Sequence, residues 1–125
     1  MHKKGNKNVN EKYDFRILNA LLKLPIPLKT FDNHLVYFDS NKRNETIYEH
    51  IANKKHRLHL VDIKLIPDIL NDKKSIKKDR NGLRYRSYIG KRKKRNEKNK
   101  YLKIVTYVRN NNRESIITIC TSKNN

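Results

Sequence analysis

Strict alternation of side chains over the final third of the chain restricts its fold more than any other feature. Residues 83–89, 101–109 and 114–121 each alternate between two sets of side chains. Because successive side chains of a β-strand point to opposite faces, a period of two predicts a strand in each segment. The turn-forming Asn110-Asn111-Asn112 separates the last two segments, and a very basic loop over residues 90–100 separates the first two. The sequence therefore predicts an antiparallel meander.

The chain before the meander carries apolar side chains at helical spacing. Three segments have this pattern and predict helices: residues 13–24, 44–55 and 58–70. Pro25 and Pro27 end the first of them, because proline cannot continue a helix and restricts the residue before it. Pro67 lies inside the third, where it either kinks the helix or begins a new turn. Residues 34–38 predict one short strand between the first two helices.

Helices followed by a meander predict an α+β fold. We expect N-terminal helices packed on one face of a C-terminal three- to four-stranded antiparallel sheet, with the other face open. The 125 residues fit one domain, over residues 12–125, and residues 1–11 read as a flexible basic tail dense in Lys and Asn. No apolar run has the length of a membrane span, and the N-terminus does not resemble a signal peptide. We therefore expect a cytoplasmic protein without a membrane partner.

The charge of the chain predicts a polyanionic partner. Lys and Arg number 31 against 12 Asp and Glu, which gives a formal net charge of +19. Abundant Lys, Asn and Ile also arise in A/T-rich genomes, but attraction to phosphate follows from the charge in either case. The chain has only three glycines and no Gly-rich phosphate loop, and no paired-carboxylate constellation stands out. These features disfavour nucleotide hydrolases and two-metal nucleases.

Histidines supply the candidate chemistry. His50, His56 and His59 lie within ten residues of one another, whereas His34 lies in a short strand without a local chemical partner. Histidine exchanges a proton near neutral pH, so a histidine pair beside a cationic sheet favours acid/base chemistry. No acidic residue stands at ligand spacing, so we expect neither a metal nor a cofactor. For any single one of these histidines, the alternative is a half-buried structural role.

Metal-free RNA cleavage needs a base, an acid and cations that stabilise the charged phosphorane. Five side chains at alternating positions of the three strands suit the cationic and positioning roles: Arg84, Arg86, Lys103, Tyr107 and Thr118. Their faces coincide if the strand register permits. The alternative is that they belong to the solvated outer face of the sheet.

The basic loop predicts a phosphate contact without sequence specificity. Its residues are Lys91, Arg92, Lys93, Lys94 and Arg95. Together with the ring of Tyr107, they are our candidate nucleic-acid-binding residues.

Three short motifs resemble a known family. Tyr48-Glu49-His50-Ile51 followed by His56, the apolar run Ile66-Pro67-Asp68-Ile69-Leu70, and the terminal Ile116-Ile117-Thr118-Ile119 look like the BECR nucleases. This is the barnase/EndoU/colicin/RelE group, and its phage-associated branch is the most similar. The similarity spans residues 34–123. It implies a helical pair on a curved antiparallel sheet and metal-independent RNA cleavage, often as a toxin. RNA is then the substrate, and an acidic inhibitor or antitoxin protein is a further partner.

The resemblance also implies roles for residues. It makes His50 or His56 the acid or base, places Arg84, Arg86 or Lys103 at the phosphate, and gives Thr118 the hydroxyl of the final strand. The chain departs from the family pattern in its density of Lys, and in having Cys120 where the pattern often has an aromatic residue.

Two other classes remain open. A noncatalytic RNA- or DNA-binding domain needs the charge and exposed aromatic side chains but no histidine; its candidates are Tyr85, Tyr88, Tyr101 and Tyr107. A structural or partner-binding protein needs neither the charge nor the exposed aromatic side chains.

Overall fold

The computed structural model describes residues 12–40, 45–78, 84–93 and 97–124. The predicted tail, residues 1–11, and the loop residues Lys94 and Arg95 lie outside them. The helices are α2 (Phe15–Leu22), α3 (Ile47–Ala52) and α4 (Leu60–Leu70), with short 3₁₀ turns η1 (Lys54–His56) and η2 (Lys73–Ser75). The strands are β1 (Leu28–Lys29), β2 (Leu35–Phe38), β3 (Ile76–Lys78), β4 (Tyr85–Lys91), β5 (Tyr101–Arg109) and β6 (Arg113–Ser122).

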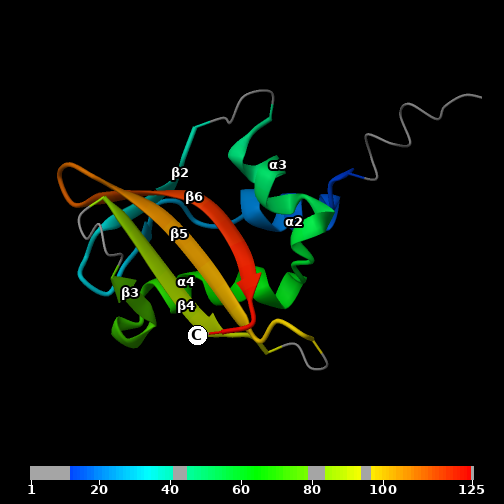
Figure 1. Ribbon diagram of the computed structural model, residues 1–125. Helices are drawn as coiled ribbons and strands as arrows, with labels where there is room; N and C mark the ends of the chain where they lie inside the picture. The colour runs from blue at the N-terminus through cyan, green and yellow to red at the C-terminus, as the bar shows by residue number, and fades with distance from the viewer. Residues whose placement is uncertain (1–11, 41–44, 79–83, 94–96, 125) are drawn as a thin grey trace, which may run out of the picture.

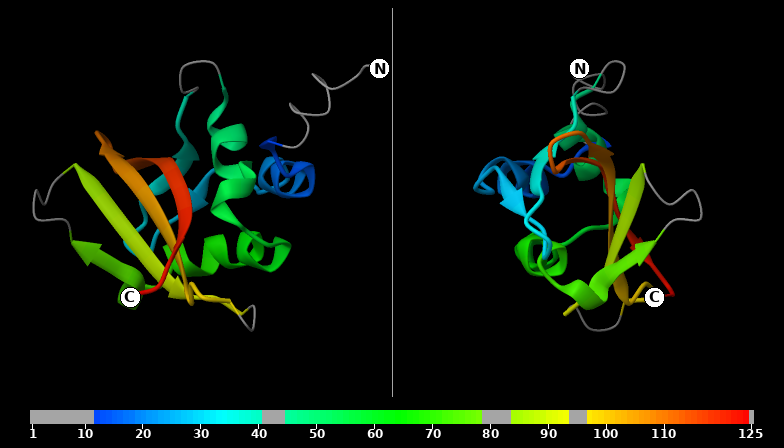
Figure 2. Two further views of the ribbon diagram at one scale, coloured as in Figure 1. Left: turned by 45° about the vertical axis from the view of Figure 1, so that its right-hand side comes forward. Right: turned by 90° about the vertical axis from the view of Figure 1, so that its left-hand side faces the viewer.

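The strands form one curled sheet in the order β1-β2-β6-β5-β4-β3 (Figures 1 and 2). Neighbouring strands are antiparallel except β2 and β6, which are parallel. The predicted three- to four-stranded antiparallel sheet behind N-terminal helices is therefore wrong. The sheet has six strands and is mixed, β1 and β2 come between α2 and α3, and the two added edge strands span only two and three residues. Strands this short carry no alternation that a sequence pattern reveals.

Local capping explains where the helices begin. The Asp14 side chain accepts hydrogen bonds from the backbone of Arg16 and Ile17 at the start of α2. Thr46 and Glu49 form a reciprocal capping box at the start of α3. Helix α4 continues through Pro67 to Leu70 as one element. None of the described helices combines the length and the apolar character of a membrane-spanning helix.

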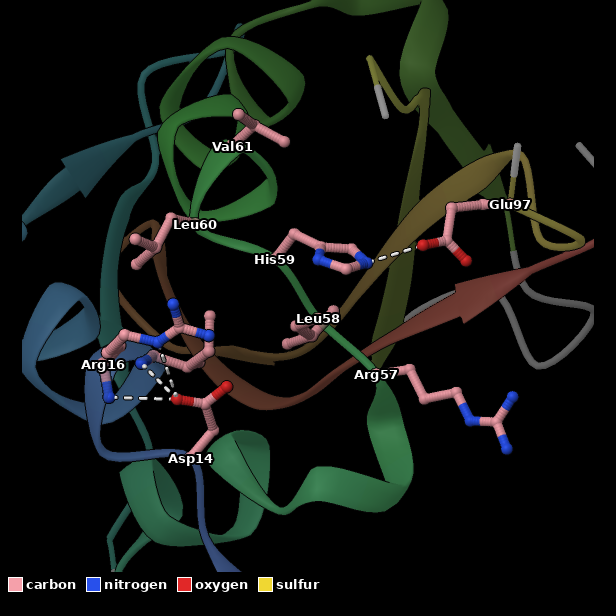
Figure 3. A pocket seen from close by; sticks show the side chains of 9 residues that line it. Asp14, Arg16, Arg57, Leu58, His59, Leu60, Val61 and Glu97 are labelled. Carbon is pink, nitrogen blue, oxygen red and sulfur yellow. Dashed lines mark hydrogen bonds and ion pairs between the residues drawn. The ribbon is translucent and has the colours of Figure 1, made fainter. Parts of the chain in front are cut away.

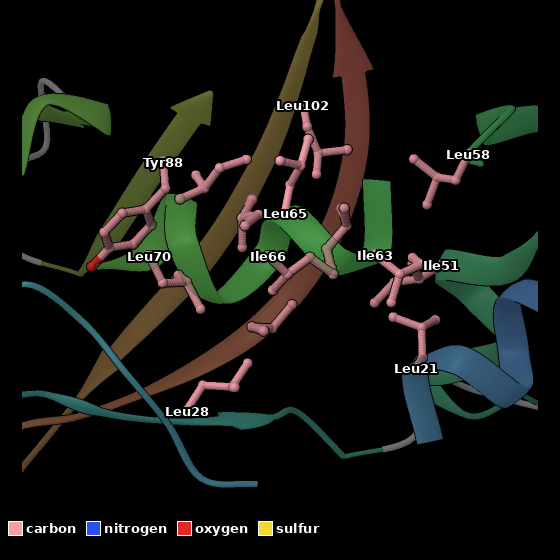
Figure 4. Close-up of a cluster of buried hydrophobic side chains, with 14 of the residues drawn as sticks. Leu21, Leu28, Ile51, Leu58, Ile63, Leu65, Ile66, Leu70, Tyr88 and Leu102 are labelled. Atoms are coloured by element: carbon pink, nitrogen blue, oxygen red, sulfur yellow. The ribbon is translucent and has the colours of Figure 1, made fainter. Parts of the chain in front are cut away.

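The core lies between the helices and the inner face of the sheet (Figure 4). Strand side chains that point inward are fully buried, among them Tyr88, Leu102 and Ile104. They meet apolar side chains of all three helices, such as Leu21, Ile51, Ile63, Ile66 and Leu70. Helix α4 lies behind strands β4–β6 in Figure 1 and approaches β4 closely at Gly90. A Cβ atom added there would lie 2.5 Å from Cγ1 of Ile69, so this contact requires glycine.

The β5–β6 hairpin has two irregular features. Its turn places Asn111 and Asn112 in the left-handed region, with φ of 64° and 57°, which asparagine tolerates better than most residues. The register shifts by one residue at Ile117, because Val105 pairs with Thr118 whereas Thr106 pairs with Ile116. Strand β2 pairs with β6 only as far as Ile116. After that residue β5 is the one described strand that pairs with β6, and helix α3 packs against β6.

Candidate functional site

Four side chains from three segments form what we call the two-histidine cluster: Tyr13, Glu45, His50 and His56. The rings of His50 and His56 lie edge to face, with centroids 5.4 Å apart. Nδ1 of His50 lies 3.3 Å from Oε1 of Glu45, and the Tyr13 hydroxyl donates to the other oxygen of that carboxylate at 2.9 Å. Tyr13 is held by a β-bridge to Asn53. Helix α3 and the turn η1 thus place both imidazoles side by side.

The two imidazoles have different surroundings. Burial lowers the pKa of His56, although Nδ1 of its ring donates to the carbonyl of Ile51 at 3.1 Å and partly opposes this shift. This shift favours the neutral form of His56, and its Nε2 forms no hydrogen bond with the described residues. Burial raises the pKa of Glu45, but the hydrogen bonds from Tyr13 and His50 outweigh it and hold that pKa below its usual value. Nδ1 of His50 thus faces a carboxylate, and no described residue is hydrogen-bonded to its Nε2.

Such a pair can move two protons in one reaction. A neutral imidazole accepts a proton, and a neighbouring imidazolium with a carboxylate partner donates one. The two side chains are only partly buried; the His50 side chain is 20% exposed.

Arg86 lies in a buried polar network rather than on the open face. Its guanidinium donates to Glu114 at 2.8 Å and to both oxygens of Asp32 at 2.8 and 3.1 Å. Glu114 is fully buried and also accepts from Tyr88, Thr106 and the His34 ring, all within 3.0 Å. The network fixes the loop between β1 and β2 on the inner face of the sheet. Arg86 is thus occupied as an internal counter-ion.

This network contradicts the view of His34 as a residue without a partner. Ligand atoms of Asp32, His34 and Glu114 lie within 4.8 Å of one another, a spacing that a metal ion also uses. In this network the guanidinium of Arg86 already supplies the positive charge, and donors surround Glu114. We therefore assign the network a structural role.

Arg92 is also internal. Its side chain is 2% exposed and forms two hydrogen bonds to the buried Asp62, from Nε at 2.9 Å and from Nη2 at 2.8 Å. The basic loop was predicted to hold phosphate through Arg92 among others. Because Arg92 is paired with Asp62 in the interior, it is not free to do so. Lys91 and Lys93 are exposed.

Lys103, Tyr107 and Thr118 share the outer face of the sheet, which no described helix covers. The strand register places further aromatic and basic side chains on this face: Tyr37, Tyr85, Tyr101, Arg109 and Arg113. Tyr85 and Tyr107 meet edge to face at 5.3 Å, and the Arg109 guanidinium lies 4.9 Å from the Tyr107 ring centroid. Tyr88, a further aromatic candidate, is instead buried on the inner face. Aromatic rings that are exposed, such as Tyr85, or partly exposed, such as Tyr107, lie between cations and form a surface on which bases can stack.

The structure thus groups the predicted site residues into two sets. His50 and His56 are together, and Lys103, Tyr107 and Thr118 are together. Arg84 is exposed directly before β4. Among the described residues, no hydrogen bond or ion pair joins either histidine to Arg84, Lys103 or Thr118.

His59 lies apart from the other two histidines of its segment. Nε2 of its ring is 2.6 Å from Oε1 of Glu97, and both residues line a pocket of about 620 Å³ between the start of α2 and the start of α4 (Figure 3). Sequence reasoning did not find this pair, because Glu97 lies 38 residues away in a charged loop.

Comparisons of the chain with protein-family models, with curated proteins and with solved structures gave no match.

Proposed function

We propose that the protein is a metal-independent endoribonuclease, related to the BECR nucleases, that acts through the two-histidine cluster. The edge-to-face contact of His50 and His56 carries this proposal. It joins two groups able to transfer protons within a chain whose charge of +19 attracts RNA. An RNA substrate accounts for both features at once.

The reaction is a transesterification. Neutral His56 takes the proton of the 2′-hydroxyl, and the 2′-oxygen attacks phosphorus. The bond from phosphorus to the 5′-oxygen then breaks, and His50, as the general acid, gives a proton to that oxygen. The products are a 2′,3′-cyclic phosphate and a 5′-hydroxyl. Lys103 and Thr118, on the outer face of the sheet, remain candidates for contacts to the phosphate.

The second candidate is a noncatalytic RNA- or DNA-binding domain. The outer face of the sheet favours it, because Tyr85 and Tyr107 alternate there with Lys103 and Arg109. In either case we expect a protein that works in the cytoplasm. If it is a toxin, we expect an acidic inhibitor protein to cover the cationic surface.

Incubation with diverse RNAs in excess EDTA distinguishes the two candidates. The nuclease cuts and leaves cyclic phosphate ends, whereas the double variant His50→Ala/His56→Ala, purified identically, does not. The double variant also controls for contaminating ribonuclease. If the wild-type protein leaves every RNA intact but binds it with a steep salt dependence, the binding domain takes the place of the nuclease.

A further inference from the structure

Two adjoining pockets share Arg57, the residue that follows His56 of the two-histidine cluster. The larger, of about 620 Å³, is lined by residues from the start of α2, the start of α4 and the β4–β5 connection, including Arg16, Leu58, His59, Leu60 and Val61. The smaller, of about 300 Å³, is lined by Arg57, Lys98, Thr121 and Lys123 among others. Arg57 and Glu97 line both, so the pockets meet there. Arg57 directly follows His56 in the chain.

The two pockets differ in chemistry. Leu60 and Val61 form an apolar wall of the larger pocket. Both are large apolar residues, yet they are 42% and 40% exposed. In the smaller pocket Arg57, Lys98 and Lys123 are exposed cations. The acidic group there, Glu97, already faces His59. An anion is therefore favoured in the smaller pocket, and a flat, partly apolar group in the larger.

Buried hydrogen bonds hold the shared wall in place. The His59 backbone N–H donates to Oδ2 of Asp62 at 2.8 Å, and Asp62 is paired with Arg92. Arg92 also donates to the carbonyl of Asn99 at 3.0 Å. Arg57 has a φ of 53°, a conformation that persists only where its surroundings enforce it. In Figure 3 its side chain extends away from Asp14 and Arg16. The pockets are thus preformed, with Arg57 at their junction.

We propose that these pockets bind one nucleotide of the RNA strand next to the scissile bond. The phosphate lies against Arg57, Lys98 and Lys123, and the nucleoside lies against Leu60 and Val61. His59, held by Glu97, leaves Nδ1 for a hydrogen bond to the base or ribose. This assignment rests on RNA as the substrate, but binding of a nucleotide is measured without any cleavage.

Titration with nucleoside 5′-monophosphates, followed by NMR or calorimetry, tests the proposal. Arg57→Asn removes the charge and keeps a residue that tolerates positive φ, and Lys74→Asn makes the same charge change on exposed η2, outside the pockets. We expect Arg57→Asn to weaken binding roughly tenfold or more, because a charge-assisted contact is lost, and Lys74→Asn to leave it unchanged. Equal weakening by both variants, or no saturable binding to the wild type, overturns the proposal.

Two further measurements distinguish binding of phosphate alone from binding of the whole nucleotide. Inorganic phosphate should bind more weakly than the nucleotide, and Val61→Trp, which fills the larger pocket, should reduce nucleotide affinity to that of phosphate. If phosphate binds as tightly as the nucleotide, the nucleoside assignment is wrong. Nucleotide binding without RNA cleavage in EDTA overturns the nuclease and retains the pocket. If the protein cleaves RNA but Arg57→Asn binds the nucleotide as tightly as the wild type does, the nuclease is retained and the pocket assignment is wrong.

Discussion

Arg92 and Asp62 form a two-bond ion pair in the interior, although they are 30 residues apart in sequence. The pair connects the end of β4 to the first turn of α4. Removing one partner leaves the other charge buried and uncompensated, which costs about 3–5 kcal/mol. We expect Arg92→Ala to lower the free energy of unfolding by that amount in urea titrations.

The neighbouring Lys93 provides the matched control. It is exposed, so Lys93→Ala should change stability by no more than about 0.5 kcal/mol. Equal stabilities of the two variants would contradict the internal role of Arg92.

Asp32 predicts a dependence of stability on pH. Burial raises the pKa of Asp32, but hydrogen bonds from Arg86 and Thr30 outweigh it and bring that pKa to about 2, from 3.8 for a free side chain. A folded-state pKa below the unfolded value gives stability that is complete above pH 3.8 and disappears as the pH falls towards 2. Asp32→Asn should therefore be less stable at pH 7 and lose less stability between pH 4 and pH 2. Denaturation midpoints measured across that range test this, and parallel curves for the two proteins would refute it.

Close packing at Gly90 predicts a coupled pair of substitutions. A Cβ at position 90 meets Ile69 at 2.5 Å, so Gly90→Ala should cost about 1–3 kcal/mol through overpacking. Ile69→Ala removes the obstructing atoms, and Gly90→Ala should cost much less in that background. Additive losses in a double-mutant cycle would mean that the strand and helix adjust freely.

Long periodic segments made several individual helices and strands predictable, although the predicted sheet was wrong. The predicted segments 101–109 and 114–121 agree with β5 and β6, and the proline-bounded first helix with α2. What the sequence did not reveal depends on contacts between distant segments. The parallel pairing of β2 with β6 joins residues almost 80 positions apart, and nothing in a four-residue strand specifies its neighbour.

The same distinction between local and distant contacts explains which residues of the candidate site were predicted and which were missed. His50 and His56 were found because they are neighbours in sequence. The network around Glu114 was missed because the partners of this carboxylate come from two other strands and a loop. One signal was present: Glu114 alternates in phase with the buried Ile116, and a carboxylate in that phase needs buried donors.

The outer face of the sheet predicts separate electrostatic and stacking contributions to RNA binding. Lys103→Ala should reduce the slope of log affinity against log salt by about 0.7 for single-stranded RNA if it contacts one phosphate. Lys74→Ala, on η2 away from this face, should leave the slope unchanged. Tyr107→Ala should weaken binding by about 1–3 kcal/mol at every salt concentration, since stacking does not release counterions. Fluorescence anisotropy with a labelled oligonucleotide measures all three, and identical slopes for the two lysine variants would exclude Lys103 from the interface.

Catalysis should depend on both histidines in different ways. Acid/base catalysis by one side chain contributes about 10²–10⁴-fold, so His50→Ala and His56→Ala should each reduce cleavage in EDTA within that range and leave RNA affinity intact. Because burial lowers the pKa of His56 from the usual 6.5, a base at that position becomes half protonated only below pH 6.5. The acidic limb of the rate profile should therefore lie below that pH, and it should disappear in His56→Ala. Glu45→Gln keeps a hydrogen-bond acceptor for His50 but removes the carboxylate, so it should lower the rate at pH 7 less than His50→Ala does. If the acidic limb persists in His56→Ala, another group is the base and the assignment of His56 is wrong.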